Sequence, residues 1–304
     1  MHTSDDKTDP SSSNFSAWLL LIVLSLIWGS SFILIKKGLL AFQPGEVAGL
    51  RILSASLFLL PIALRNLKKV KTRKHWIFLF TSGFLGSFIP AFLFPLAQTK
   101  IDSSIAGVLN ALTPFFTIVI GAILFNARFT RRVSMGILIG FIGSVILMTA
   151  GAGGGFQTIN FYALYIVLAT ILYGINVNIL KYYLGDIRPL HITSFALMLI
   201  CPFSVVYLLF YTDVLTTISE DPNSILPLSY IVFLGVVGTA ISLILFNKLV
   251  KKTNIVFSSS VTYLIPIVAV IWGIWDGESL TLQHYTGMIG IILGVLLANM
   301  GKRR

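Results

Sequence analysis

Cysteine, histidine and charged residues are scarce in this chain of 304 residues. The single cysteine, Cys201, has no partner within the chain, which excludes an intrachain disulfide, a cysteine zinc site and an iron–sulfur cluster. The four histidines, which are far apart and form no HExxH or similar pattern, are His2, His75, His191 and His284. A Walker motif is also absent, so ATP is not the direct energy source. We therefore expect no metal, no cofactor and no catalytic residues.

Charged residues make up only 11% of the chain, whereas soluble proteins average about a quarter. Hydrophobic residues account for 56%, and the mean hydropathy is +0.91. These values predict an all-α polytopic membrane protein in contact with the lipid bilayer. In a soluble protein the net charge of +11 would suggest a nucleic-acid partner. Here the basic residues fall in particular loops, which a membrane explains better, so no nucleic-acid partner is expected.

Ten apolar stretches are long enough to cross a bilayer as helices, because a hydrocarbon core of about 30 Å needs about 20 apolar residues. They are residues 17–35, 45–64, 75–97, 103–125, 133–150, 160–180, 190–211, 225–250, 255–275 and 284–299. Residues 1–16 are polar and lack the basic segment and cleavage site of a signal peptide. We expect residues 1–16 to form a disordered cytoplasmic tail.

The loops on the two sides of a ten-span arrangement differ in charge. One side carries Lys7, Arg65, Lys68, Lys69, Lys71, Arg73, Lys74, Arg128, Arg131, Arg132, Lys181, Arg188, Lys248, Lys251, Lys252, Lys302, Arg303 and Arg304. The other side carries Lys36, Lys37, Lys100 and the acidic residues Asp213, Glu220, Asp221, Asp276 and Glu278. Cytoplasmic loops of membrane proteins have an excess of lysine and arginine. Both termini are therefore predicted to lie in the cytoplasm.

The two halves of the chain, residues 17–150 and 160–300, match each other in the same order. Pro114 corresponds to Pro266, which lies 152 residues later (266 − 114). Further matches are Trp28-Gly29 with Tyr173-Gly174, Lys36 with Lys181, Pro44 with Pro189, Phe84-Leu85-Gly86 with Phe233-Leu234-Gly235, and Gly136 and Gly143 with Gly287 and Gly294. Each half holds five spans, an odd number, so the second half enters from the opposite side of the membrane. Two inverted-topology five-helix repeats are typical of secondary transporters, which bind substrate at the midplane between the repeats.

Five segments carry a resemblance to a known family: WGSSFILIKKGL from Trp28, PGEVAGLRILSASLFLLP from Pro44, NALTPFFTIVIGAIL from Asn110, TYLIPIVAVIWGIWDGESLT from Thr262 and GMIGIILGV from Gly287. With these segments the chain resembles the EamA-type branch of the drug/metabolite transporter superfamily. The resemblance implies a ten-helix permease of the bacterial inner membrane, of a family whose members mostly export amino acids and other small metabolites. The chain departs from the family where an acidic residue often follows span four, because it reads Asn126-Ala127-Arg128 there.

Polar residues flank the two central prolines and are candidates for a substrate site. A proline in a helix frees the carbonyl four residues earlier, which here belongs to Asn110 or Thr262. In lipid a freed carbonyl must face protein or a water-filled cavity. We therefore expect spans four and nine to face each other across a mid-membrane substrate cavity. Its predicted lining includes Asn110, Pro114, Ser259, Thr262, Tyr263 and Pro266; the alternative is a kink whose polar side chains only cap the carbonyls.

Spans one and six carry corresponding aromatic and polar residues. Trp28 and Ser31 on span one match Tyr173 and Asn176 on span six. An aromatic ring beside polar groups at mid-span suits an amphipathic metabolite, and we expect all four residues to bind substrate. Ordinary helix packing is the alternative.

Three charged residues are candidates for gating. Arg51 is the one clearly intramembrane charge, and such residues are usually functional or paired. It would bind a carboxylate or stabilise the outer mouth; alternatively it reaches the interface and pairs with Glu46. Glu278, which follows span nine, is expected to act at the outer gate.

These features predict a secondary transporter, and in particular an exporter, that moves small amphipathic metabolites such as amino acids by alternating access. Every acidic residue lies in the tail, in a loop or near an interface, which argues against a deep proton relay and favours facilitated diffusion or exchange. A channel or a non-transporting membrane subunit is the alternative, and a lipid-acting enzyme is a weaker one. Glycines on spans five and ten (Gly136, Gly140, Gly143, Gly287, Gly290 and Gly294) predict packing seams within the chain, while monomer and homodimer both remain open.

Overall fold

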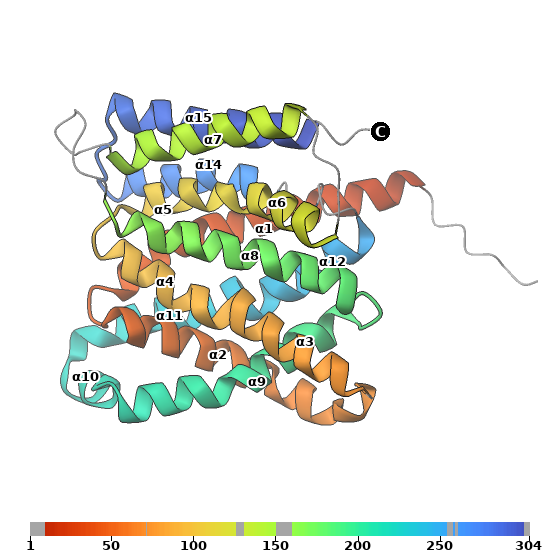
Figure 1. Ribbon diagram of the computed structural model, residues 1–304. Coiled ribbons are helices and arrows are strands. Elements are labelled where there is room, and N and C mark those ends of the chain that lie inside the picture. The colour runs from red at the N-terminus through yellow and green to blue at the C-terminus, as the bar shows by residue number, and fades with distance from the viewer. Residues whose placement is uncertain are drawn as a thin grey trace, which may run out of the picture.

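The computed structural model describes residues 10–70, 72–125, 131–149, 160–253, 258 and 261–300. Its helices are α1 (Pro10–Gly38), α2 (Pro44–Arg65), η1 (Leu67–Lys69), α3 (Arg73–Gly83), η2 (Phe84–Phe88), α4 (Ile89–Gln98), α5 (Ser103–Leu109), η3 (Asn110–Leu112), α6 (Thr113–Phe125), α7 (Arg131–Thr149), α8 (Ala163–Tyr183), α9 (Pro189–Phe210), α10 (Val214–Glu220), η4 (Pro222–Ser224), α11 (Ile225–Gly235), η5 (Val236–Ile241), α12 (Ser242–Lys252), α14 (Val261–Trp275) and α15 (Leu282–Met300). Every regular element in the described part of the chain is a helix, which confirms the predicted all-α class (Figure 1).

Among the described residues, seven helical segments are long and apolar enough to cross a membrane. They are Ser16–Gly38, Pro44–Arg65, Arg73–Gln98, Ser103–Leu124, Ala163–Tyr183, Pro189–Phe210 and Pro222–Lys252. These segments coincide with the predicted spans one to four and six to eight. The other three predicted spans overlap α7, α14 and α15, so a helix lies at every predicted span.

The first helix starts earlier than the sequence pattern suggests. α1 begins at Pro10, so residues 10–16 of the predicted disordered tail are helical, and that part of the prediction is wrong. Proline is favoured at the first position of a helix because its missing N–H would be unpaired there in any case. Residues 1–9 lie outside the described part of the chain.

Two of the long segments are interrupted by a π-helical turn, η2 in the first half and η5 in the second. A glycine immediately before each turn lets a neighbouring helix come close. A Cβ atom on Gly83 would lie 2.6 Å from the carbonyl oxygen of Ala196, and one on Gly235 would lie 1.9 Å from Ser54 Oγ. π-turns inside α-helices often occur at functional sites.

The contacts between helices come in matched pairs. α2 packs against α9, and α7 packs against α15. α1 packs against α14, α11 and α12, while α8 packs against the corresponding helices α6, α3 and α4. α2 contacts α11 as α9 contacts α3. Each of these contacts of the first half therefore has a counterpart in the second.

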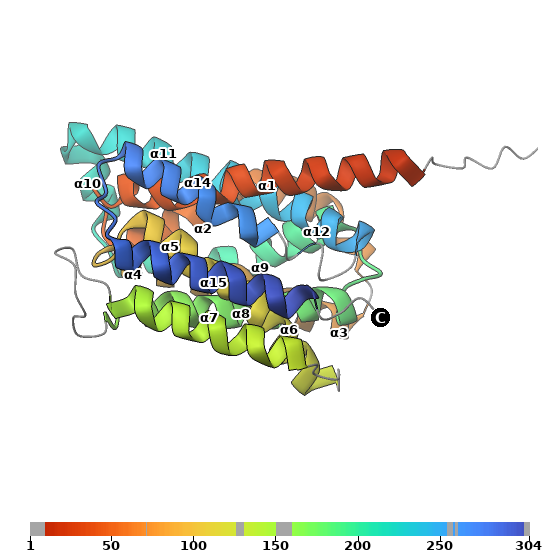
Figure 2. The ribbon, with the colours of Figure 1, turned by 90° about the horizontal axis from the view of Figure 1, so that it is seen from above.

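Helices α7 and α15 lie side by side at one edge of the protein (Figures 1 and 2). Glycines bring their backbones together. A Cβ atom on Gly294 would lie 2.3 Å from the Gly140 nitrogen, and one on Gly143 would lie 2.9 Å from the Gly287 carbonyl oxygen. The predicted glycine seam is thereby confirmed as a contact within one chain.

We expect Gly294→Leu to destabilise the protein, because its side chain has no room beside Gly140. Overpacking of this kind costs about 1–3 kcal/mol. Thermal unfolding of the purified protein in detergent measures the effect. Leu293→Ala is the matched control, since Leu293 lies on the exposed side of α15. Equal unfolding temperatures for the two variants would contradict the close backbone contact.

Candidate functional site

A cavity in the interior is lined by residues from both halves of the chain. The space that the centre of a water molecule can reach in this cavity is about 110 Å³. A single water needs about 10–15 Å³ of such space, so the cavity has room for several waters or a small solute. Seven predicted site residues line it: Trp28, Ser31, Arg51, Asn110, Tyr173, Asn176 and Thr262.

Two aromatic pairs form part of the cavity wall. The rings of Trp28 and Phe246 lie 5.1 Å apart between centroids, and those of Tyr173 and Phe94 lie 6.1 Å apart. The Trp28 indole donates to the carbonyl oxygen of Gly238 at 3.1 Å, which fixes its orientation. The pairs correspond to each other in the repeat, because Trp28 matches Tyr173 and Phe94 lies 152 residues before Phe246 (246 − 94).

The Asn176 amide is positioned by neighbours from the third helical segment. Its Oδ1 accepts a hydrogen bond from Ser82 Oγ at 2.7 Å. Its Nδ2 lies where Gly86 leaves room, since a Cβ atom on Gly86 would be only 2.1 Å away. Ser31, the residue that matches Asn176, donates to the Ile27 carbonyl oxygen at 3.0 Å. The two matched polar residues therefore differ in what they offer to a ligand.

Arg51 is the one charged residue among the described residues of the lining. Its Nε donates to Thr239 Oγ1 at 2.8 Å, and the Thr239 hydroxyl donates to the Leu234 carbonyl oxygen at 3.2 Å. No ion pair joins Arg51 to Glu46 in the described part of the chain, so the predicted alternative pairing is wrong. Glu46 is buried near the start of α2, where it accepts from the Gln43 backbone at 2.8 Å. Such a contact pairs a backbone N–H that the helix leaves free.

Pro114 and Pro266 are buried but are not among the described lining residues of the cavity. Asn110, four residues before Pro114, lines the cavity, while the Thr113 hydroxyl donates to its carbonyl oxygen at 2.8 Å. The Asn110 carbonyl is therefore capped, and Asn110 also lines the cavity. The two predicted alternatives, a cavity lining and a capped kink, thus occur together at this residue. Ser259 and the Tyr263 side chain lie outside the described residues.

Several lining residues were not predicted from the sequence: Ser87, Phe94, Thr113, Gly238, Thr239 and Phe246. Some of them could have been found from the repeat, because Gly86-Ser87 and Gly238-Thr239 are separated by the same 152 residues as the prolines (238 − 86). Gly86 packs on Asn176, and Gly238 lies near the matching residue Ser31. The predicted match of Gly86 with Gly235 is therefore off by three residues.

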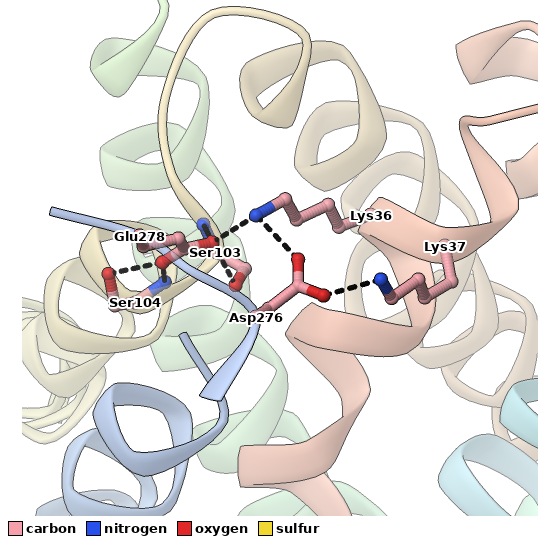
Figure 3. A network of polar contacts seen from close by, with 6 residues as sticks. All are labelled: Lys36, Lys37, Ser103, Ser104, Asp276 and Glu278. Carbon is pink, nitrogen blue, oxygen red and sulfur yellow. Dashed lines mark hydrogen bonds and ion pairs between the residues drawn. The ribbon is translucent and has the colours of Figure 1, made fainter. Parts of the chain in front are cut away.

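A second polar site ties three segments together at one end of the protein (Figure 3). The Glu278 carboxylate accepts from the backbone N–H groups of Ser103 and Ser104, each at 3.0 Å, and from both hydroxyls, each at 2.6 Å. Lys36 contacts Glu278 Oε1 at 2.9 Å and Asp276 Oδ2 at 2.7 Å. Lys37 also pairs with Asp276.

This network joins the end of α1, the start of α5 and the loop between α14 and α15 (Figure 3). A carboxylate at a helix start is favoured by the free N–H groups and by the helix dipole. Burial disfavours ionisation of Glu278, but hydrogen bonds from Ser103, Ser104 and Lys36 outweigh it and hold the pKa of this carboxyl below its usual range. Glu278 is therefore an ionised link between three segments, and it lies outside the described cavity lining.

Comparisons with known proteins identify relatives over nearly the whole chain. The model of the EamA-like transporter family matches residues 15–149 and 160–300. An uncharacterized transporter of Archaeoglobus fulgidus is 27% identical over 92% of this chain and 97% of its own length. The uncharacterized inner membrane transporter YedA of Escherichia coli is 24% identical over 93% of this chain and 90% of its own length. A Salmonella typhimurium protein named a probable amino-acid metabolite efflux pump is 27% identical over 93% and 95%, respectively.

A solved crystal structure shares the fold. It superposes with a TM-score of 0.66 over 95% of this chain and 98% of its own, at 18% sequence identity. The similarity at this level of identity concerns the arrangement of the helices.

We expect Glu278→Gln to lower the stability by about 2 kcal/mol at neutral pH, because charge-assisted hydrogen bonds are lost. Because the pKa of Glu278 is lower in the folded protein than in a free glutamate (about 4.3), its ionisation stabilises the fold at pH values above about 4.3. This stabilisation is lost as the pH falls through the pKa of Glu278 in the folded protein. Thermal unfolding between neutral and acid pH measures the difference between wild type and variant.

The difference should shrink on acidification, whereas a constant difference would contradict the ionised state of Glu278. Asp213→Asn serves as the control, because Asp213 is exposed and forms no ion pair among the described residues.

Proposed function

Because the chain belongs to the EamA-like transporter family, we propose that it is a secondary transporter that exports small amphipathic metabolites, such as amino acids, by alternating access. The observation that carries this proposal is the cavity, in which Arg51, two amide side chains and two aromatic pairs from both halves meet. Ligand sites typically combine apolar walls with a few convergent polar groups.

The proposed mechanism uses two repeats, residues 17–150 and 160–300, arranged as ten spans with inverted topology. The matched helix contacts and the two π-turns at corresponding places support this arrangement. In inverted-repeat transporters, one repeat rocks against the other around a central site. A cavity lined from both halves fits that movement.

The cavity chemistry favours a substrate with a carboxylate and an apolar body. The Arg51 guanidinium matches a carboxylate, and the Trp28 and Tyr173 rings suit the apolar part. Asn110, Asn176 and Thr262 would complete the recognition of polar groups, and Pro114 and Pro266 are proposed to support them from behind. The name of the Salmonella typhimurium relative agrees with amino acids as one such class.

The proposed location is the inner membrane, with both termini in the cytoplasm. The excess of basic residues on one side supports this orientation. The Lys36–Asp276–Glu278 network then lies at the outer face, where it would hold the outer gate closed. Glu46 would lie at the same face, and we propose that it stabilises the mouth through its contact with Gln43.

The proposed energy coupling is exchange or facilitated diffusion. No carboxylate is among the described residues that line the cavity. A proton relay through the centre of the bundle would need such a group. A monomer is sufficient for the proposed mechanism, because both halves of the cavity come from one chain.

We expect Arg51→Gln to reduce exchange of a neutral amino acid in proteoliposomes about tenfold or more, since a charge-assisted contact to the carboxylate is lost. Arg51→Lys should retain part of the activity. Arg65→Gln is the matched control, because Arg65 lies on the same helix but is exposed and outside the cavity lining. Equal loss in the Arg51→Gln and Arg65→Gln variants would count against the proposed site.

Cysteine labelling separates a carrier from a channel. We introduce Asn110→Cys or Thr262→Cys into a Cys201→Ala background and add a membrane-impermeant thiol reagent from either side. A carrier is expected to expose each position to one side at a time, so that a ligand or mutation that favours one state changes the labelled side. Labelling from both sides in a single state would instead identify a channel.

A further inference from the structure

A second pocket lies where α8 ends, α9 begins and α12 ends. The end of α8 and the end of α12 are on the right in Figure 1. Lys181, Asn247 and Lys251 contribute polar groups, and apolar side chains such as Leu184 and Ile192 form the walls. Its volume, measured in the same way, is about 210 Å³. No described residue lines both this pocket and the central cavity.

Asn247 contributes a buried amide to the lining of this pocket. The residue is only 7% exposed, and its Nδ2 donates to Thr193 Oγ1 at 2.9 Å. The Thr193 hydroxyl itself donates to the Pro189 carbonyl oxygen at 3.2 Å, so its oxygen must accept from the amide. This arrangement fixes the orientation of the amide. Asn247 Oδ1 has no hydrogen-bond partner among the described residues, although an unpaired buried acceptor costs about 1–3 kcal/mol.

Lysine supplies the pocket with positive charge. Lys181 corresponds to Lys36 in the repeat, but Lys36 is neutralised by two acidic partners. The positions that match those partners, 152 residues earlier, are Leu124 and Asn126, and neither is acidic. No ion pair of Lys181 or Lys251 occurs in the described part of the chain. The charge of both lysines therefore remains available to a ligand.

An equivalent pocket at the other end of the bundle has the same construction. It lies where α1 ends, α2 begins and α4 ends, and Lys36, Pro44 and Gln98 line it. Gln98 is also buried, and neither polar atom of its side chain has a partner among the described residues. A lysine and a buried amide with an unpaired polar atom thus line a pocket in each half, although the amides are not at matched positions, because Gln98 corresponds to Val250. Of these two pockets, that of Lys181 is the one with a lysine that forms no ion pair among the described residues.

We propose that the pocket of Lys181, Asn247 and Lys251 binds an anionic group that carries an N–H donor beside it. The lysine ammonium groups pair with the anion, and Asn247 Oδ1 accepts the hydrogen bond from the donor. The apolar wall of Leu184 and Ile192 packs against the rest of the ligand. A zwitterionic amino acid and a phosphatidylethanolamine headgroup both carry an anionic group close to an ammonium group. The lipid differs from the amino acid because acyl chains are attached to its headgroup.

Binding measurements on the purified full chain distinguish these two sources. Radiolabelled leucine is titrated by equilibrium dialysis, and short-chain phosphatidylethanolamine is titrated in native mass spectrometry of the delipidated protein. We expect one probe to occupy a site that Lys181→Gln and Asn247→Leu each weaken about tenfold. The site should persist in Arg51→Gln, which separates it from the central cavity and makes the test independent of transport.

Matched variants control for charge and for folding. Lys252→Gln removes the same charge from an exposed neighbour that does not line the pocket, and Gln98→Leu alters the equivalent pocket. Both are expected to bind as wild type does, and Lys181→Arg should bind almost as well. The proposal is overturned if neither probe binds, or if Lys181→Gln and Lys252→Gln bind equally. If leucine binding is lost only in Arg51→Gln, leucine occupies the central cavity, which agrees with the proposed transport site. The proposal for the second pocket is then overturned unless the lipid probe binds and Lys181→Gln weakens its binding.

Discussion

A protein inside a bilayer has no water to pair its backbone, so irregular backbone is tolerated only where protein or a water-filled cavity satisfies it. This constraint explains where the helices of the chain are interrupted. The π-turns η2 and η5 and the short turn η3 each contribute residues to the central cavity. These three interruptions therefore lie where the cavity or neighbouring side chains can satisfy the freed backbone groups.

The matched halves make the departures from symmetry informative. Arg51 corresponds to Ala196, so one half alone provides the cationic group of the cavity. Lys36 is held by two acids, whereas Lys181 has no ion pair among the described residues. A symmetric scaffold thus carries different charges at its centre and at its two ends. Such differences allow a carrier to treat its two sides unequally.

Much of the helical arrangement follows from apolar length, because lipid requires helices of a defined span. Seven of the predicted site residues also line one cavity. Asn110 and Thr262 could be matched from the sequence because they are separated by the same 152 residues as the two central prolines. The hydrogen-bond partners of the site residues could not be predicted in this way. Arg51 donates to Thr239, which is far away in sequence, and the pairing depends on how the π-turn η5 presents its hydroxyl. The predicted match of Gly86 is off by three residues because two runs of similar apolar residues can be aligned in several registers.

The glycine seam between α7 and α15 also bears on the order in which the chain assembles. α7 ends at Thr149, but its partner begins only at Leu282, so everything between them must be synthesised first. Until then the glycine face of α7 lacks this partner. The seam therefore closes only when α15 is in place, and α15 completes the wall that the first half leaves open.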